Sequence, residues 1–199
     1  RPGVLVNASA VGFYGNRGDE EVSEASGPGT GFLAETTVAW EEAARRAVPE
    51  GVRLVLLRIG IVLGEEGGAL SKMLLPFRLG LGGPLGSGRQ WMPWIHRDDL
   101  VALLVASLED PRFDGAVNAT APAPVTMKEF ASTLGQVLHR PSFAPAPAFA
   151  IRAAMGEMAA LVLDGQRVLP AKASSLGFRF RFDELETALR KILDRPSRG

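Results

Sequence analysis

The sequence has 199 residues, of which 46% are hydrophobic and 22% charged, with a mean hydropathy of +0.10. This composition predicts a folded chain of one or two domains and excludes a disordered protein. Lys and Arg number 22 and Asp and Glu number 22, so the basic excess typical of a general nucleic-acid binder is absent. Because the chain has no Cys, disulfide scaffolds, thiolate metal sites and thiol nucleophiles are excluded.

The hydropathy of the chain gives no sign of a membrane protein. Its apolar runs are far shorter than the ~20 residues that a helix needs to cross a bilayer. The N-terminal residues also lack the basic-then-apolar pattern of a signal peptide. We therefore expect a cytoplasmic location, with neither a membrane nor a nucleic acid as partner.

The first third of the chain alternates strand and helix patterns. A short β-like run at residues 4–8 leads into a turn of small residues, and a Gly-rich loop follows to about residue 31. Apolar residues at helical spacing predict a helix over 32–48, ended by Pro49 and Gly51. The Leu-rich and β-branched run at 52–59 is typical of a strand buried on both faces of a parallel sheet.

The middle of the chain is punctuated by glycine and then returns to regular patterns. A helix over 69–81 is predicted to break at Pro76, and residues 91–95 read as an extended segment. Asp98 is predicted to cap a helix over 100–108. A third strand is predicted at 116–119.

The last third is predicted to be mainly helical. Thr126 and Glu129 form a capping box, which predicts a helix to about residue 138. A further helix is expected over 149–163, and a second capping box, Asp183 to Glu186, is predicted to open the final helix. Alternating strands and helices predict an α/β layer architecture.

No phosphate-binding loop is present in the sequence. Neither G-x-G-x-x-G nor G-x-x-x-x-G-K-[ST] occurs, and the nearest string, Gly83 to Gly88, contains Pro and does not join a strand to a helix. Ser9 and Tyr14 follow the first strand, where α/β sheets bind ligands, but a turn-forming Ser beside a packed Tyr is the more common explanation of such residues.

Two other polar or aromatic clusters also have two explanations. His96 is followed by Arg97 and two Asp, which would cap a helix, whereas one His supplies too few ligands for a metal, so we expect no metal site. Trp91 and Trp94 lie in a Gly-rich stretch, where they could line a ligand pocket or fold back onto the core.

Taken together, several motifs resemble the extended short-chain dehydrogenase/reductases, and in particular their atypical, nucleoside-diphosphate-sugar epimerase-like subfamily. The resemblance covers the whole chain. The motifs that carry it are Ser9 to Gly15, Trp40-Glu41, Leu57 to Gly64, Gly86 to Trp91, Trp94 to Leu100 and Asn118 to Pro122.

This resemblance implies a Rossmann-like parallel sheet whose N-terminal strands, with their glycine loop, are missing from this chain. Residues 1–66 would be the C-terminal part of a Rossmann-type NAD(P)-binding domain. Residues 67–199 would form mainly a smaller α+β substrate-binding region, with a strand and helix near 94–120 returning to the sheet. The chain would thus be the C-terminal two-thirds of a longer protein.

The resemblance also implies site residues and a cofactor, NADP being slightly preferred over NAD. Ser9 would orient a carbonyl or hydroxyl group against the nicotinamide, and Tyr14 would relay a proton. The cofactor would be lined by Ala8, Ser9, Ala10, Arg58, Ile59, Gly60, Ile61 and Val62. The small-molecule substrate would be lined by Arg89, Trp91, Trp94 and His96, together with Ser9 and Tyr14.

One departure from the family pattern leaves two functions open. The family's Tyr-x-x-x-Lys pair is replaced by Leu33 and Thr37, and Leu cannot carry a proton. The first hypothesis is an NAD(P)-linked oxidoreductase or epimerase-like enzyme acting on a small carbonyl or hydroxyl substrate, with homodimer formation left open. The second is a catalytically degenerate protein of the same fold that binds a dinucleotide or a partner.

Overall fold

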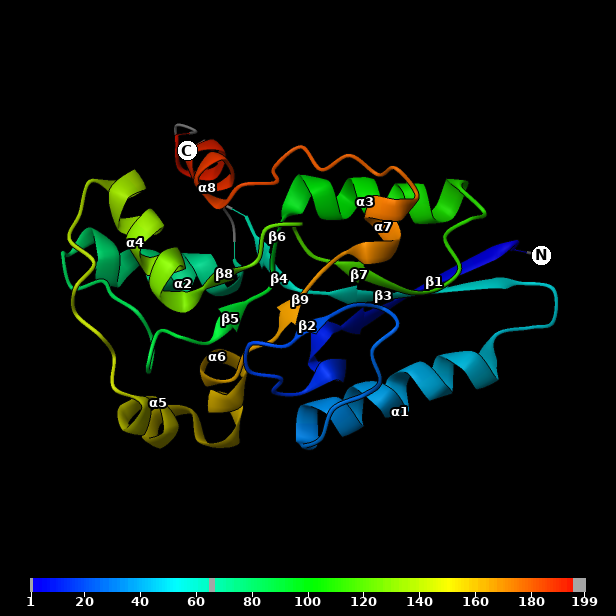
Figure 1. Cartoon of the computed structure of the whole chain (residues 1–199), viewed down its shortest axis with the longest axis horizontal. Coiled ribbons are helices and arrows are strands. Elements are labelled where there is room, and N and C mark those ends of the chain that lie inside the picture. Colours follow the sequence, from blue (N-terminus) through cyan, green and yellow to red (C-terminus); the bar gives the residue numbers. More distant parts are fainter. Residues whose placement is uncertain (1, 65–66, 195–199) are drawn as a thin grey trace.

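The computed structural model describes residues 2–64 and 67–194 (Figure 1). Its centre is a three-stranded parallel sheet in the order β1-β3-β7. The three strands are β1 (Val4–Ala10), β3 (Arg53–Ile59) and β7 (Gly115–Ala119). The α/β architecture with a parallel sheet, predicted from the alternating patterns, is confirmed.

Helices cover both faces of this sheet (Figure 1). Helix α1 (Phe32–Ala47) lies on one face, and α3 (Arg97–Glu109) with α7 (Ala171–Ser175) lies on the other. Alternate side chains of β3 explain this layering. Val55 and Leu57 pack into a core with Leu103 of α3, whereas Arg58 points to the opposite face and reaches α1. The near-continuous apolar run of β3 therefore serves two layers.

A close approach at Gly60 joins this sheet to the next element. The Gly60 N–H donates to Ala119 O, and a Cβ at Gly60 would overlap the carbonyl oxygen of Pro93. The chain then continues as β4 (Ile61–Leu63), which pairs in parallel with β6 (Trp94–His96). Gly60 is therefore required where the chain turns out of the central sheet.

A second core lies beside the sheet, at the left in Figure 1. It includes Leu63, Trp94, Phe130, Leu134 and Leu189, all fully buried. The helices around it are α2 (Gly68–Arg78), α4 (Met127–Leu138) and α8 (Leu185–Leu193). A short antiparallel pair, β5 (Trp91–Met92) with β8 (Val125–Thr126), leads into α4, where the predicted capping box of Thr126 and Glu129 is confirmed.

Shorter elements complete the described residues. They are the 3-10 helices η1 (Val11–Tyr14) and η2 (Gly156–Ala159), the helices α5 (Ala148–Met155) and α6 (Ala160–Leu163), and the parallel pair β2 (Glu21–Val22) with β9 (Arg167–Val168). Within the ranges 2–64 and 67–194, no helix combines the length and the apolar character needed to cross a membrane.

Two predicted helix starts are wrong. The cap of α3 is His96, whose Nδ1 accepts a hydrogen bond from the N–H of Asp98, so Asp98 lies inside the first turn. An imidazole acceptor can replace the usual Ser, Thr or Asp oxygen at this position. The final helix begins only at Leu185, because Glu184 has an extended backbone, and its start has no side-chain cap.

Two predicted helix bodies also differ from the structure. Pro76 lies within α2, which continues to Arg78. The helix predicted over 149–163 is divided into α5, η2 and α6, because Gly156 has a positive φ of 58° that ends α5.

Candidate functional site

Three polar side chains form a row across the central sheet, near the carboxyl ends of its strands. Ser9 of β1 is in register with Arg58 of β3, which is in register with Asn118 of β7. All three are at least 95% buried. Ligands of open α/β sheets bind at this edge of the sheet, so the row is the first place to look for a functional site.

The row is tied to α1 by an ion pair between Arg58 and Glu41, which is fully buried. Arg58 Nε donates to Glu41 Oε1 at 2.7 Å, and Arg58 Nη2 donates to Oε2 at 2.9 Å. This two-pronged geometry is the strong form of a charge-assisted hydrogen bond. Ser9 Oγ also donates to Glu41 Oε1, at 2.8 Å, and Arg45 Nη2 donates to Oε2 at 3.0 Å.

The environment of Glu41 keeps it ionised. Burial by itself disfavours the charged carboxylate and would raise the pKa of Glu41. Hydrogen bonds from Arg58 and Ser9 and the positive charge of Arg58 outweigh this penalty, so the pKa of Glu41 lies below its usual value. The carboxylate therefore acts as a fixed acceptor for Ser9 and is a weak base.

The phenol of Tyr14 closes the network from the end of η1. Its hydroxyl donates to Asn118 Oδ1 at 2.7 Å and accepts from Arg58 Nη1 at 3.0 Å. Burial raises the pKa of Tyr14, which the nearby Arg58 only partly offsets, so the phenol stays protonated at neutral pH. The Arg58 guanidinium also lies over the ring of Phe13, 3.4 Å from its centroid.

The loop after Tyr14 is tied to β7 by Glu24. One carboxylate oxygen of Glu24 accepts from the N–H of Asn118 at 2.9 Å, and the other accepts from the N–H of Lys172 at 3.2 Å. Gly29 packs so closely on Tyr14 that a Cβ would overlap the Tyr14 carbonyl oxygen. The Gly-rich loop therefore covers the network, and its glycines permit the close approach.

The residues predicted to line the cofactor lie at the same strand ends. Ala8 is exposed and Ala10 half-buried at the end of β1, while Ser9 and Arg58 belong to the buried network. Ile59, Gly60, Ile61 and Val62 follow in β3 and β4, and all four are half-buried.

The two tryptophans predicted to line the substrate occupy different surroundings. Trp94 is fully buried in the second core, and its indole N–H donates to Ala123 O at 3.1 Å. Trp91 is half-buried, donates to Asp19 Oδ1 at 2.8 Å and has the Arg167 guanidinium 4.7 Å from its ring centroid.

The other two predicted substrate residues also differ from each other. His96 is buried, caps α3 and stacks on Phe182 with 3.9 Å between ring centroids. Arg89 is exposed. In the part of the chain that the structure describes, no cluster of three or more His, Cys, Asp or Glu could hold a metal ion.

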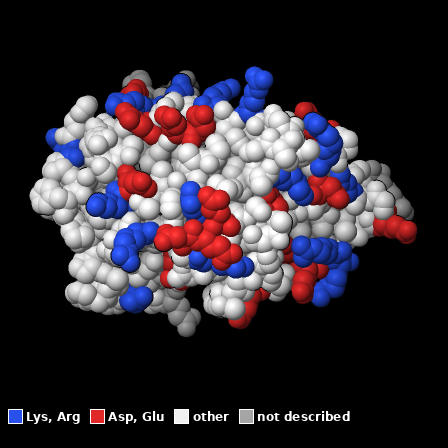
Figure 2. Space-filling model, in the orientation of Figure 1, with Lys and Arg blue, Asp and Glu red and all other residues white. Residues whose placement is uncertain are grey.

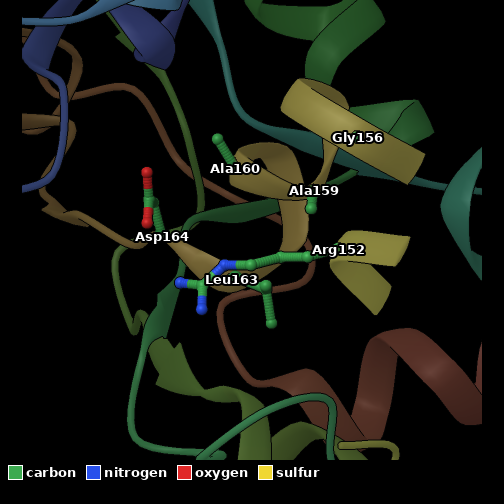
Figure 3. Close-up of a pocket in the computed structure, with 6 residues that line it drawn as sticks. All are labelled: Arg152, Gly156, Ala159, Ala160, Leu163 and Asp164. Carbon is green, nitrogen blue, oxygen red and sulfur yellow. The ribbon is translucent and has the colours of Figure 1, made fainter. Parts of the chain in front are cut away.

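A separate cavity of about 470 Å³ opens between α5, η2 and α6 (Figure 3). In Figure 3 the long side chain of Arg152 extends past Leu163 toward the segment that carries Asp164. The residues that line this cavity are Arg152, Gly156, Ala159, Ala160, Leu163 and Asp164. The residues predicted from the sequence do not belong to this lining.

Sequence reasoning did not identify Glu41, Asn118 and Glu24 as members of the network. A signal was available for Asn118, because it is the one polar residue in the predicted strand 116–119. Register between strands is not encoded locally, so the meeting of Ser9, Arg58 and Asn118 required the structure.

Comparison with known proteins identifies the family to which the chain belongs. Residues 1–119 match the NAD dependent epimerase/dehydratase family, and residues 146–192 match a domain of unknown function, DUF1731. The Arabidopsis thaliana protein named "Epimerase family protein SDR39U1 homolog, chloroplastic" is 49% identical over 97% of this chain and 55% of its own length.

Two solved structures are similar in both sequence and fold. The human epimerase family protein SDR39U1 (isoform 2), crystallised with NADPH, has 40% identity and a TM-score of 0.92, over 98% of this chain and 66% of that one. A nucleoside-diphosphate sugar epimerase from Corynebacterium glutamicum has 34% identity and a TM-score of 0.77, over 96% of this chain and 37% of that one. The chain spans 55% to 66% of the length of its first curated relatives.

Proposed function

Because the chain belongs to the NAD dependent epimerase/dehydratase family, we propose that it contributes the nicotinamide side and the substrate region of an NAD(P)-linked oxidoreductase or epimerase-like enzyme. The observation that carries the proposal is the row of Ser9, Arg58 and Asn118 near the carboxyl ends of three parallel strands. This is the edge at which dinucleotides bind in doubly wound sheets.

The side chains at this edge fit a nicotinamide dinucleotide. Ala8 and Ala10 keep the end of β1 free of bulky groups, while Ile61 and Val62 offer half-buried apolar surface suited to one face of a nicotinamide ring. NADP is the preferred cofactor, which the NADPH in the similar human protein supports. The cofactor would accept or supply a hydride, and the chain would orient the substrate.

The hydrogen bonds of Ser9 limit how it can meet a substrate. Ser9 Oγ uses its one proton in the bond to Glu41, so its free lone pair can only accept a further hydrogen bond. A substrate hydroxyl is the matching donor. We therefore assign to this site a substrate that is held as an alcohol, with Ser9 orienting its hydroxyl group.

The proton-relay role predicted for Tyr14 requires a change of partner. Its proton is donated to Asn118 and its oxygen accepts from Arg58. To give a proton to a substrate, the phenol would have to exchange the bond to Asn118 for one to the substrate. Until such an exchange is measured, Tyr14 is assigned a positioning role beside Arg58.

A second surface supports the view that a larger sheet forms around this chain. The outer edge of β1 has no strand beside it among the described residues, and such an edge presents unpaired backbone groups. The outer face of α3 next to it is apolar, with Val101, Leu104, Val105 and Leu108 exposed. Helices that carry apolar side chains on their outer face as well as on their inner face are typically buried, so the outer face of α3 is expected to be covered. We propose that residues of the complete protein outside this chain cover both features and supply the glycine loop.

The test compares the complete protein that contains these residues with its Ser9→Ala variant. An alcohol panel with NADP⁺ is expected to reveal a substrate whose turnover falls roughly 100-fold in the variant, the scale of losing an orienting or proton-transferring group. NADPH affinity should fall far less than turnover, because Ala8, Ala10, Ile61 and Val62 still line the cofactor. Turnover that is unaffected by Ser9→Ala would contradict the proposed role.

One observation favours the alternative, a degenerate dinucleotide-binding protein. Thr37, at the position of the family's Lys, is buried and donates its hydroxyl proton to Leu33 O at 2.7 Å, and Leu33 itself has no titratable group. The alternative predicts saturable NADPH binding without turnover of any carbonyl, alcohol or sugar-nucleotide substrate. A single substrate with turnover sensitive to Ser9→Ala excludes it.

A further inference from the structure

Two segments far apart in the sequence form one surface at the left-hand end of the molecule in Figure 1. The chain leaving α2 runs beside the chain between α4 and α5. Arg140 Nε donates to Arg78 O at 3.3 Å, Ala144 N donates to Gly82 O at 3.1 Å, and Leu85 pairs with Ala146. Gly83 is required here, because a Cβ would overlap the carbonyl oxygen of Ala144.

This surface carries large apolar side chains that project into solvent. Four of them, here called the apolar tip, are between 65% and 78% exposed: Leu75, Leu79, Leu81 and Phe143. Leu75 and Leu79 are one helical turn apart, with Leu79 N bonded to Leu75 O. Leu81 and Phe143 directly precede the bonded residues Gly82 and Ala144. Exposed apolar groups gathered in this way mark an interaction surface.

The two sequence ranges that carry the apolar tip are mainly basic, although the whole chain has no net charge. In residues 67–94 and 121–155, which end with α5, only Glu129 is acidic. The basic residues of the same ranges are Lys72, Arg78, Arg89, Lys128, Arg140 and Arg152. In Figure 2 the corresponding left-hand edge is white with blue side chains among the white.

Although the sequence alone predicts no membrane partner, we propose that the apolar tip docks onto an anionic membrane surface, with Leu79, Leu81 and Phe143 entering the headgroup region and Arg78 and Arg140 contacting lipid phosphates. This combination of projecting apolar groups and nearby cations is the chemistry of peripheral membrane binding. A second copy of the chain fits less well, because two basic surfaces would repel. A partner helix fits less well, because amphipathic helices bind in hydrophobic grooves, whereas the side chains of the apolar tip project from the surface.

The proposal is tested by co-sedimentation of the complete protein with phosphatidylcholine vesicles, with and without phosphatidylglycerol. We expect the protein to bind the vesicles that contain phosphatidylglycerol, and this binding should weaken as salt is raised. In the double variant Leu79→Gln, Leu81→Gln, binding should fall at least about tenfold. Arg78→Gln should also weaken binding to the anionic vesicles. Because all three residues are exposed, the thermal unfolding midpoint should not change.

Matched controls change an exposed residue of the same kind elsewhere. Trp40→Gln on α1 and Arg179→Gln near the C-terminus should bind vesicles as the unchanged protein does. Equal binding by the Leu79/Leu81 variant and the unchanged protein would overturn the proposal. Failure of the unchanged protein to bind the anionic vesicles would also overturn it. A second copy of the chain or a partner helix would then be the occupant if the Leu79/Leu81 variant abolished self-association in light scattering or binding of an acidic amphipathic peptide.

Discussion

At the scale of single residues, Arg58 determines the geometry of the candidate site. Its guanidinium contacts Glu41 twice, donates to the Tyr14 hydroxyl and lies over the Phe13 ring, all in the protein interior. Burial disfavours its charge and would lower the pKa of Arg58, but the bonds to Glu41 and Tyr14 reverse this, so its pKa is raised and it stays charged. Each partner of Arg58 therefore depends on that charge.

Replacing Arg58 by Met should destabilise the fold strongly. The change leaves the buried Glu41 with only the half-exposed Arg45 as counter-ion, which is expected to reduce the free energy of unfolding by roughly 3–5 kcal/mol in urea titrations. The control is Arg45→Met, because Arg45 pairs with the same carboxylate from a half-exposed position and should cost about 1 kcal/mol or less. Similar losses in the two variants would contradict the importance given to Arg58.

The stability of the fold should depend on Glu41 as the pH falls. Since the pKa of Glu41 is lower in the folded protein than its ordinary value of 4.5, its contribution is complete above that value and is lost as the pH drops through the lower, folded value. Glu41→Gln should therefore give a flatter acid limb in a plot of the free energy of unfolding against pH. An acid limb as steep as that of the unchanged protein would exclude Glu41 as its source.

At the scale of elements, Asp99 joins α3 to the chain that leads into α8. Its two carboxylate oxygens accept from the N–H groups of Arg181 and Phe182, both at 2.9 Å, and the Asp99 side chain is buried. This contact links residues 82 and 83 positions apart in the sequence. It fixes the route of the segment between α7 and α8 along α3 (Figure 1).

Asp99→Ala, compared with a neighbouring variant, should show how much this contact contributes to the free energy of unfolding beyond the effect of a carboxylate in the first turn of α3. Two backbone N–H groups lose their acceptor, which is expected to lower the free energy of unfolding by about 2–4 kcal/mol. Asp98→Ala is the matched control, because the neighbouring side chain lies in the same first turn but is about a third exposed, and it should cost about 1 kcal/mol or less. A cost for Asp99→Ala no greater than that for Asp98→Ala would show that the contact is unimportant.

Elements defined by local chemistry were predictable from the sequence, and elements defined by distant contacts were not. The helix after Thr126 followed from its capping box, and the buried strand that becomes β3 followed from its apolar run. The cap of α3 was mistaken because Asp is the commoner cap, whereas the structure uses His96. Glu41 lay within a correctly predicted helix, but only its burial against Arg58 identifies its role.

At the scale of the whole molecule, two regions meet along the carboxyl ends of the parallel strands. The central sheet ends with Ser9, Arg58 and Asn118, and the chain passes through Gly60 into β4 beside the second core. The exposed apolar face of α3 and the outer edge of β1 lie on the opposite side from the apolar tip in Figure 1. The proposed contacts with the rest of the protein and with a membrane would thus use separate surfaces.

The ends of β1 and β3 are the proposed binding site of a nicotinamide dinucleotide. Amide hydrogen exchange of the complete protein, measured with and without saturating NADPH, reports on this site residue by residue. NADPH is expected to slow exchange in residues 8–10 and 59–62, while exchange in α4 and α8 changes little. Unchanged exchange in both strand-end segments, at NADPH concentrations where calorimetry detects binding, would exclude this binding site.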